Sequence, residues 1–323
     1  MTRTRELLGK APGATILVVG DLMLDRYLTG TVDRISPEAP VPVVRVEGES
    51  LALGGAGNVA ANVVALGASC EVVGVVGDDS EGKVLLDRLG ALGVGVQGVS
   101  VIPGRPTTVK TRIMARHQHV TRVDREDPSD IGAQWAETLA EAITTLLPKC
   151  QGLALEDYNK GVLVTKVIHD ALRGSLSVGI PSVVDPKRLR FFEYEGATVF
   201  KPNARELEDA LGDHLQADNP AWMESVRARL GVQNLLLTLG ERGMALQCAE
   251  GGFMRVPTVA REVYDVSGAG DTVTAVMVVG LAVGGTPMEA AVMANHAAAV
   301  EVGKTGVATV SLEEILQQQQ QHK

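Results

Sequence analysis

Short apolar segments that end beside an acidic residue alternate with helical segments along most of the chain. Four apolar segments have the length of strands, at residues 15–19, 70–76, 152–155 and 182–184. Helical segments alternate with them, at residues 59–66, 82–92, 130–147 and 164–174. Buried strands that alternate with helices are typical of a parallel sheet covered on both faces. The sequence therefore predicts an α/β fold, a doubly wound and mostly parallel sheet flanked by helices.

Two segments interrupt this alternation. Residues 28–53 contain the turn-forming Thr29-Gly30-Thr31 and a series of prolines, and they show extended rather than helical character. Residues 105–124 alternate like a hairpin. We expect both to form a small β lid inserted into the α/β core of a single domain spanning 1–323. The Gln-rich end, residues 315–323, is predicted to be a frayed tail.

Composition excludes several classes of function. The chain has 30 basic and 39 acidic residues and a formal charge of −9, which argues against nucleic-acid or anionic-membrane binding. Three widely spaced cysteines indicate neither a disulfide framework nor a zinc site and are typical of a reducing compartment. The longest apolar run, residues 273–283, is about half of the roughly 20 residues that a membrane span requires. We expect a cytoplasmic protein without a membrane segment.

The segment from Asp265 to Asp271, with the sequence DVSGAGD, combines an anion site with a carboxylate. It follows a strand-like run at residues 255–263 and opens an apolar helical run at 272–283. Glycines let the backbone N–H groups approach an anion, and the helix N-terminus adds partial positive charge. Asp271 is then placed to accept a proton from a hydroxyl beside bound phosphate. The structural alternative is a tight turn that Asp271 caps.

Other polar residues follow strands or precede helices. Asp21 and Asp25 could hold polyol hydroxyls, although Asp21 could instead satisfy a loop backbone. Gly54 and Gly55 lead into a helix that carries Asn58, either a ligand site or a tightly packed helix start. Further along, Asn203 and Glu206 fit a capping box, a magnesium and nucleotide-phosphate site, or both.

The strand at residues 234–238 is followed by Gly240 and Gly243, which suit a turn beneath a nucleotide. The run Gly303-Lys304-Thr305 is similar to the end of a Walker A loop. That motif requires a glycine where this chain has Ala298, so we reject it.

Together these motifs resemble the two signatures of the ribokinase (PfkB) family of carbohydrate kinases. The N-terminal signature is Gly54-Gly55-Ala56-Gly57-Asn58 and the C-terminal one is the segment from Asp265 to Asp271. Asn203-x-x-Glu206 and Thr238-Leu239-Gly240 match the family's nucleotide motifs, so the resemblance covers essentially the whole chain. One departure is Val266, where the family usually has threonine. The resemblance implies a ribokinase-like fold and the use of ATP and Mg²⁺.

Within this family, Asp25-Arg26-Tyr27 and the run RISPEAPVPV at residues 34–43 resemble the D-glycero-β-D-manno-heptose-7-phosphate kinases. The implied reaction is ATP-dependent phosphorylation at O1 to the 1,7-bisphosphate, in ADP-heptose and lipopolysaccharide-core biosynthesis. Because bifunctional relatives carry an adenylyltransferase domain after the kinase, the end at Lys323 implies a stand-alone kinase. The alternatives are a kinase for another sugar phosphate, such as fructose 6-phosphate, and a non-catalytic sugar-binding sensor.

The resemblance also implies a set of site residues. Catalysis would fall to the anion loop and the base, namely Gly268, Ala269, Gly270 and Asp271. The sugar would contact Asp21, Asp25, Gly54, Gly55 and Asn58, and cationic candidates for its phosphate are Arg112, Arg116, Lys160 and Lys187. ATP would contact Asn203, Ala204, Arg205, Glu206, Thr238, Gly240, Gly243 and Asn295. Magnesium would have no direct protein ligand, with Glu206 acting through water, and the lid strands would pair two subunits into a homodimer.

Overall fold

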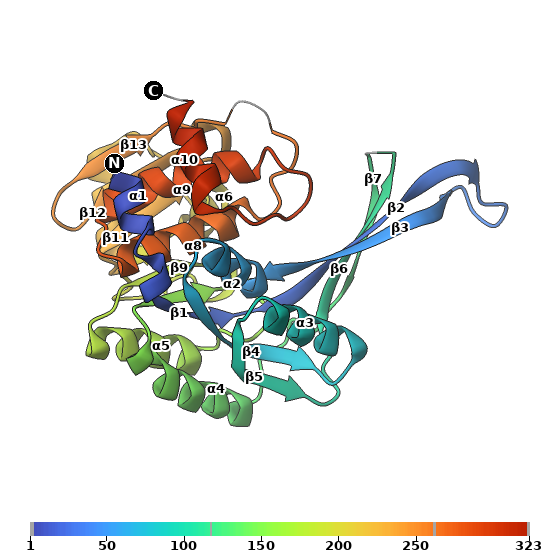
Figure 1. Cartoon of the computed structure of the whole chain (residues 1–323), viewed down its shortest axis with the longest axis horizontal. Coiled ribbons are helices and arrows are strands. Elements are labelled where there is room, and N and C mark those ends of the chain that lie inside the picture. Colours follow the sequence, from blue (N-terminus) through green and yellow to red (C-terminus); the bar gives the residue numbers. More distant parts are fainter. Residues whose placement is uncertain (1–2, 117, 261–262, 322–323) are drawn as a thin grey trace.

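The computed structural model describes residues 3–116, 118–260 and 263–321 (Figure 1). Its main body is built on a nine-stranded sheet with the order β13-β12-β11-β10-β9-β8-β1-β4-β5. The strands are β1 (Thr15–Gly20), β4 (Ser69–Gly77), β5 (Gly95–Ile102), β8 (Gly152–Glu156), β9 (Ser182–Asp185), β10 (Val199–Phe200), β11 (Asn234–Thr238), β12 (Met244–Cys248) and β13 (Phe253–Val256). Seven neighbouring strands of this sheet pair in parallel, in the order β11-β10-β9-β8-β1-β4-β5. Strands β12 and β13 add an antiparallel edge beside β11. The predicted α/β sheet is confirmed.

Helices cover both faces of this sheet. They are α1 (Arg3–Leu8), α2 (Ala56–Ala65), α3 (Ser80–Ala91), α4 (Ala133–Leu146), α5 (Thr165–Val178), α6 (Ala204–Leu211), α7 (Pro220–Leu230), α8 (Ala269–Ala282), α9 (Pro287–Glu301) and α10 (Leu312–Gln320). Short 3-10 turns occur at η1 (Ala11–Gly13), η2 (Leu147–Lys149), η3 (Arg188–Arg190) and η4 (Gly240–Arg242).

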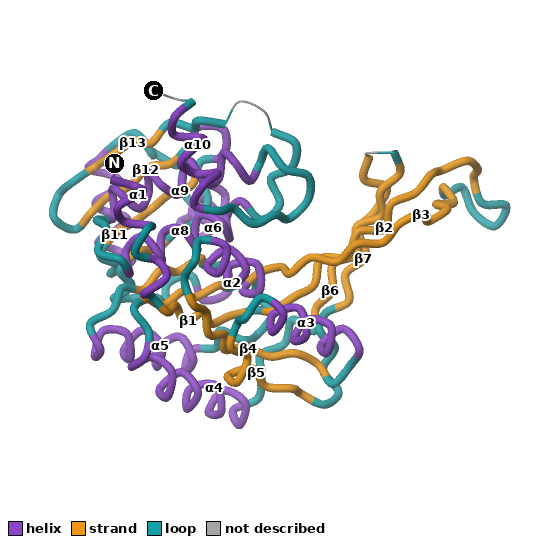
Figure 2. The backbone as a smooth tube through the Cα atoms, in the orientation of Figure 1, coloured by secondary structure: helices purple, strands orange, loops and turns teal. Residues whose placement is uncertain are grey.

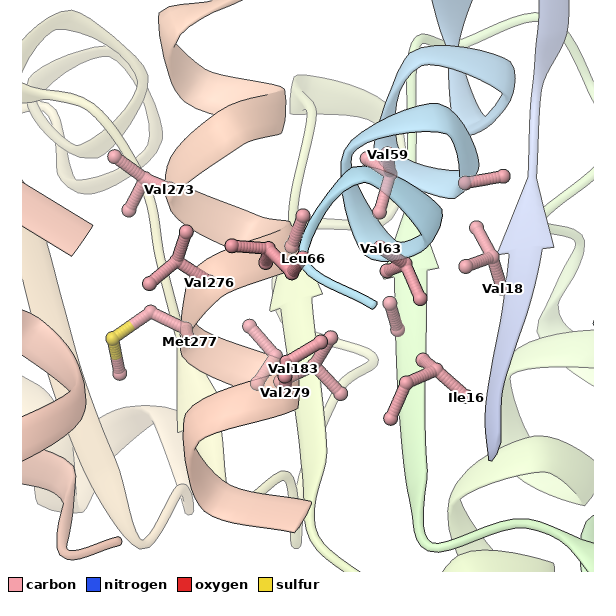
Figure 3. Close-up of a cluster of buried hydrophobic side chains, with 14 of the residues drawn as sticks. Ile16, Val18, Val59, Val63, Leu66, Val183, Val273, Val276, Met277 and Val279 are labelled. Carbon is pink, nitrogen blue, oxygen red and sulfur yellow. The ribbon is translucent and has the colours of Figure 1, made fainter. Parts of the chain in front are cut away.

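Strand β1 shows why its sequence is continuously apolar from Ile16 to Val19. Ile16 and Val18 belong to a buried cluster that also contains side chains of α2 and α8 (Figure 3). Leu17 and Val19 point to the opposite face and belong to a second cluster with side chains of α4 and α5. Successive side chains of a strand alternate between faces, so a strand buried on both faces reads as a continuous apolar run.

A second, four-stranded sheet with the order β3-β2-β6-β7 projects from the main body as a long ribbon (Figure 2). Its strands are β2 (Leu22–Ile35), β3 (Pro42–Gly55), β6 (Thr108–Ala115) and β7 (Gln118–Arg125). We call this sheet the lid sheet. The central pair, β2 and β6, runs in parallel from Met23 opposite Thr108 to Gly30 opposite Ala115, which brings the two predicted lid segments together. Strand β2 starts immediately after the end of β1, so the lid sheet is rooted at the carboxyl edge of the main sheet.

Three details differ from the sequence-based expectations. Residues 315–320, expected in an irregular tail, belong to α10, which buries Ile315 and Leu316 and is capped by Ser311. The strand expected at 255–263 ends at Val256, before a proline that cannot donate a ladder hydrogen bond, and residues 261–262 lie outside the described part. Helix α8 starts at Ala269, three residues before the expected start, so Asp271 lies in its first turn.

Candidate active site

A cavity of about 1010 Å³ lies at the carboxyl ends of β8 to β11, between the root of the lid sheet and the N-terminus of α8. Ligands of open α/β sheets bind at this edge. Most of the predicted site residues line the cavity, namely Asp25, Gly55, Arg112, Lys187, Asn203, Glu206, Thr238, Gly240, Gly243, Gly268, Ala269, Gly270, Asp271 and Asn295. The others, Asp21, Gly54, Asn58, Arg116, Lys160, Ala204 and Arg205, are not part of its lining.

The anion loop is formed by the glycines that precede and open α8. Gly268 caps the helix in a left-handed conformation, with φ of +92°. A Cβ atom at this position would lie 2.9 Å from Nδ2 of Asn58 and 3.2 Å from Oε1 of Glu301. Only glycine fits both the backbone angle and the space. Gly268, Ala269 and Gly270 line the cavity, so the N-terminus of α8 borders it, an arrangement suited to a phosphate.

Asp271 is the buried carboxylate of this turn, and both of its oxygens are held. Oδ2 accepts a 2.8 Å hydrogen bond from Nδ2 of Asn58, and Oδ1 accepts a 2.8 Å hydrogen bond from the hydroxyl of Tyr158. Burial raises the pKa of Asp271 to about 6, although the hydrogen bonds from Asn58 and Tyr158 lower it. A carboxylate with this pKa is ionised at neutral pH and still basic enough to accept a proton from a substrate hydroxyl. Asn58 does not line the cavity, and it acts on the site by holding the carboxylate of Asp271.

A cluster of buried carboxylates adjoins the base. Ligand oxygens of Glu156, Asp185 and Asp271 all lie within 4.8 Å of one another. Lys201 Nζ donates to Asp185 Oδ2 at 2.8 Å, whereas no donor group of the described residues reaches either oxygen of Glu156, which is fully buried. Burial and the charge of Asp185 raise the pKa of Glu156 well above its usual value. Hard carboxylate oxygens without a donor fit a divalent cation such as Mg²⁺.

This cluster differs from the predicted magnesium arrangement. The Asn203 and Glu206 pair forms the expected capping box of α6. The Glu206 N–H donates to Asn203 Oδ1 at 2.9 Å, and the Asn203 N–H donates to Glu206 Oε2 at 2.8 Å. Glu206 also pairs with the ammonium of Lys187. Neither Glu156 nor Asp185 was predicted as a site residue, although each occupies the last position of a buried strand. Ligands of open α/β sheets bind at such strand ends, so this position was the feature of the sequence that could have identified the two residues.

The carboxylate of Asp21 contacts the backbone of a loop and does not line the cavity. Its carboxylate accepts backbone hydrogen bonds from Tyr158 at 2.7 Å, Lys160 at 2.9 Å and Val162 at 3.2 Å. The interpretation that Asp21 satisfies a loop backbone is therefore the one that the geometry supports. The Lys160 ammonium is 2.8 Å from Glu126 Oε1, outside the cavity lining.

The lid sheet brings its own charged residues to the cavity. Asp25, on β2, forms an ion pair with Arg112 on the neighbouring strand β6, and the Arg112 guanidinium stands 5.3 Å from the centre of the Tyr27 ring. Asp25 therefore lies within the lid sheet, three residues after the start of β2. Arg116 is exposed at the β6–β7 turn, away from the cavity.

Lys110 is a cavity cation that the sequence-based reasoning missed. It lies two residues before Arg112 on β6, so both side chains share one face of the strand, which was the available signal. No described carboxylate forms an ion pair with it, and burial and the charge of Lys160 lower its pKa. Its ammonium is 4.9 Å from the centre of the Tyr158 ring, and that of Lys187 is 5.0 Å from it.

The other end of the cavity is lined by backbone turns, neutral polar groups and the acidic Glu241 of the η4 turn. Gly240 and Gly243, with φ of +59° and +79°, surround the η4 turn after β11. Asn295 of α9 donates to the Pro257 carbonyl at 2.8 Å. Arg205 points away and lies 3.7 Å from Asp209, which leaves this end suited to a flat, uncharged ring.

The chain matches a family of known proteins over most of its length. The family model described as pfkB family carbohydrate kinase matches residues 14–315. The chain is 43% identical over 313 residues to the Bifunctional protein HldE of Paramagnetospirillum magneticum, covering 96% of this chain and 64% of that protein. It is 44% identical over 317 residues to the protein of the same name from Geotalea uraniireducens, covering 98% and 63%. The chain thus spans less than two thirds of the length of these relatives.

Solved structures share the fold at lower identity. The Arabidopsis thaliana ribokinase complexed with ribose and ATP matches with a TM-score of 0.74 and 20% identity, over 94% of this chain and 98% of that one. Phosphofructokinase-2 from Escherichia coli in complex with potassium matches with a TM-score of 0.77 and 17% identity, over 96% and 100%. Among the described residues, no helix is long and apolar enough to cross a membrane.

Proposed function

Because this chain belongs to the pfkB family of carbohydrate kinases, we propose that it transfers the terminal phosphoryl group of ATP to O1 of D-glycero-D-manno-heptose 7-phosphate. The observation that carries the proposal is a buried, hydrogen-bonded Asp271 at the head of α8, inside a cavity that also contains Lys110, Arg112 and Lys187. A base, an anion loop and a set of cations are what a kinase acting on a phosphorylated sugar requires.

Asp271 is the proposed general base. It would accept the proton of the attacking hydroxyl as the oxygen–phosphorus bond forms and the bond to the ADP oxygen breaks. The N–H groups at Gly268, Ala269 and Gly270 would hold the charge of the transferred phosphoryl group. Lys201 would add positive charge there, since its Nζ is 3.6 Å from the position of a Cβ atom on Gly270.

ATP is proposed to occupy the end of the cavity near η4. Asn203, Thr238, Gly240 and Gly243 would surround its phosphates and ribose, and Asn295 would lie near its base. Magnesium, when bound, neutralises charge between the donor phosphates. Glu156 and Asp185 would hold the ion, because their buried oxygens supply hard anionic ligands and those of Glu156 have no donor among the described residues.

The phosphate of the substrate is proposed to bind at the lid end of the cavity. Arg112 is engaged by Asp25 and Lys187 by Glu206, whereas Lys110 has no described carboxylate partner. A half-buried cation that no carboxylate engages in an ion pair favours an incoming anion, because the anion restores local neutrality. Lys110 is therefore the leading candidate, with Arg112 and Lys187 completing the positive rim.

A homodimer through the lid sheet is also proposed. Ile35, Val41, Val46 and Val123 lie on or beside its strands and are each at least half exposed. The two edge strands of the lid sheet, β3 and β7, have no further strand beyond them in the described chain. A Val46→Asp variant should sediment as a monomer where the parent sediments as a dimer; a monomeric parent would refute the proposal.

The substrate is tested by ADP release with ATP and Mg²⁺ against heptose 7-phosphate, fructose 6-phosphate and ribose. Selective turnover of the heptose supports the proposal. Preference for fructose 6-phosphate would retain the kinase and refute the heptose. Sugar binding without turnover by any of the three would favour a non-catalytic sensor, a function that the intact base and anion loop disfavour.

A further inference from the structure

Tyr158 occupies the point where the base and the cationic rim meet. It follows the end of β8, and its backbone N–H donates to Asp21 Oδ2 at 2.7 Å. The same carboxylate binds the N–H groups of Lys160 and Val162. The loop that carries Tyr158 is therefore fastened to the end of β1 by a buried side chain, which fixes where the tyrosine ring emerges.

The hydroxyl of Tyr158 holds one of the two carboxylate oxygens of Asp271. It donates to Oδ1 of Asp271 at 2.8 Å, while Asn58 donates to Oδ2. A carboxylate oxygen has two acceptor positions, so each oxygen of Asp271 keeps one for a substrate hydroxyl. With a donor on each oxygen, the carboxylate plane is set by two elements of the fold, and rotation about its Cβ–Cγ bond would break both bonds.

The ring of Tyr158 lies between two ammonium groups. Lys110 Nζ from β6 is 4.9 Å from the ring centre and Lys187 Nζ from the segment after β9 is 5.0 Å from it. Cations at these distances are attracted by the electron-rich face of an aromatic ring.

We propose that Tyr158 is the positioning residue that couples the base to the phosphate-binding lysines. Its hydroxyl orients the Asp271 carboxylate toward the accepting sugar, and its ring sets the spacing of Lys110 and Lys187 around the sugar's own phosphate. This inference rests on the proposed function as a sugar-phosphate kinase. It assigns separate tasks to two parts of one side chain, so the parts can be removed one at a time.

The kinetic test compares Tyr158→Phe, which removes only the hydroxyl, with Tyr158→Leu, which also removes the ring. Tyr158→Phe should lower kcat by roughly tenfold to a hundredfold, the effect of one hydrogen bond to a charged group, and leave KM for the sugar phosphate within about twofold. Tyr158→Leu should lower kcat similarly and raise that KM by roughly tenfold, with KM for ATP unchanged in both.

Tyr194→Phe is the matched control. Tyr194 also donates to a carboxylate, Asp157 Oδ2 at 2.9 Å, but it is buried away from the cavity lining. This variant should keep kcat and both KM values. A Tyr158→Phe enzyme with parental kcat would overturn the orienting task, and a Tyr158→Leu enzyme with parental KM for the sugar phosphate would overturn the spacing task.

A spectroscopic test does not depend on which sugar is turned over. The chain contains 4 tyrosines, so protein labelled with ¹³C at tyrosine Cζ gives a simple spectrum. Asp271→Asn should move the Tyr158 signal, identified by its loss in Tyr158→Phe, and leave the Tyr194 signal in place. An unmoved Tyr158 signal would refute the hydrogen bond. If the Tyr158 signal moves but the parent protein phosphorylates none of the sugars, the hydrogen bond is supported and the proposed function is refuted.

Discussion

Asn58 and Asp271 are 213 residues apart in the chain and are joined by a buried 2.8 Å hydrogen bond. Each stands in the first turn of the helix that follows a glycine-rich segment, α2 for Asn58 and α8 for Asp271. The two helices pack together in one core, which contains Val59 and Val63 of α2 and Val273 and Val276 of α8 (Figure 3). Packing of the helices thus brings two distant sequence motifs into a single site.

Replacing the proposed base tests the chemistry without changing its shape. Asp271→Asn keeps the volume and one acceptor but cannot take up a proton. We expect kcat to fall by roughly a hundredfold to ten-thousandfold, while calorimetry shows sugar-phosphate binding within severalfold of the parent. An enzyme that keeps near-parental kcat would remove Asp271 from the role of base.

The anion loop should tolerate no side chain at Gly268. Gly268→Ala would place a methyl group 2.9 Å from Asn58 Nδ2 and force a left-handed alanine, at a cost of about 1–3 kcal/mol in unfolding free energy and a large loss of kcat. The control is Gly179→Ala at the end of α5, which has φ of +71° and open space around its Cβ position. It should cost about 1 kcal/mol and leave kcat intact. Equal kcat in the two variants would contradict the close packing of the loop.

Lys110 should determine affinity for the phosphorylated sugar. Lys110→Met removes the charge and keeps most of the side-chain volume, so KM for the sugar phosphate should rise by roughly tenfold or more with KM for ATP unchanged. Arg116→Ala, at the exposed hairpin turn, is the comparison and should leave both constants unchanged. A rise of equal size in the two variants would contradict the assignment of the phosphate to the cavity.

Glu301 introduces a pH dependence of stability beside the active site. It is fully buried at the end of α9, neither oxygen has a hydrogen-bond partner among the described residues, and Asp271, Asp265 and Lys304 are the charged groups that act on it. Burial, followed by the charges of the two aspartates, raises its pKa to about 8. The folded protein therefore holds the proton that the unfolded chain releases near its ordinary pKa of about 4.3.

Because the folded-state pKa is the higher one, the neutral Glu301 contributes fully to stability below about pH 4, and this contribution is lost as pH rises toward 8. Glu301→Gln removes the linkage. Its unfolding free energy relative to the parent should increase between pH 5 and 8 by a few kcal/mol at most, since one pKa unit corresponds to about 1.4 kcal/mol. Urea unfolding at several pH values gives the difference, and a constant difference would show that Glu301 has an ordinary pKa.

Local sequence patterns predicted the parts of the site that depend on a few consecutive residues. The turn geometry at Gly268 and the position of Asp271 follow from glycines placed before a helix. The capping box of Asn203 and Glu206 is likewise a matter of spacing within one turn. The apolar runs predicted the parallel sheet, because burial on both faces requires them.

Contacts between residues that lie far apart in the sequence could not be predicted from local patterns. Tyr158 reaches Asp271 only because β8 and β9 end at the same edge as the N-terminus of α8. The sequence pattern does not show that β2 starts at Leu22, so it could not reveal that the pairing of β2 with β6 brings Asp25 to Arg112. The terminal helix α10 was missed because its glutamines suggest solvation, whereas Gln318 donates to the Val259 carbonyl at 3.2 Å.

The position of the new phosphoryl group on the product tests the central proposal most directly. Heptose 7-phosphate is incubated with the enzyme, ATP and Mg²⁺, and the product is analysed by ³¹P NMR with correlation to the sugar protons. We predict one new phosphorus signal coupled to the anomeric proton, which identifies an ester at O1 beside the original phosphate. A new ester on another carbon, or consumption of ATP to inorganic phosphate without a second sugar phosphate, would contradict the account.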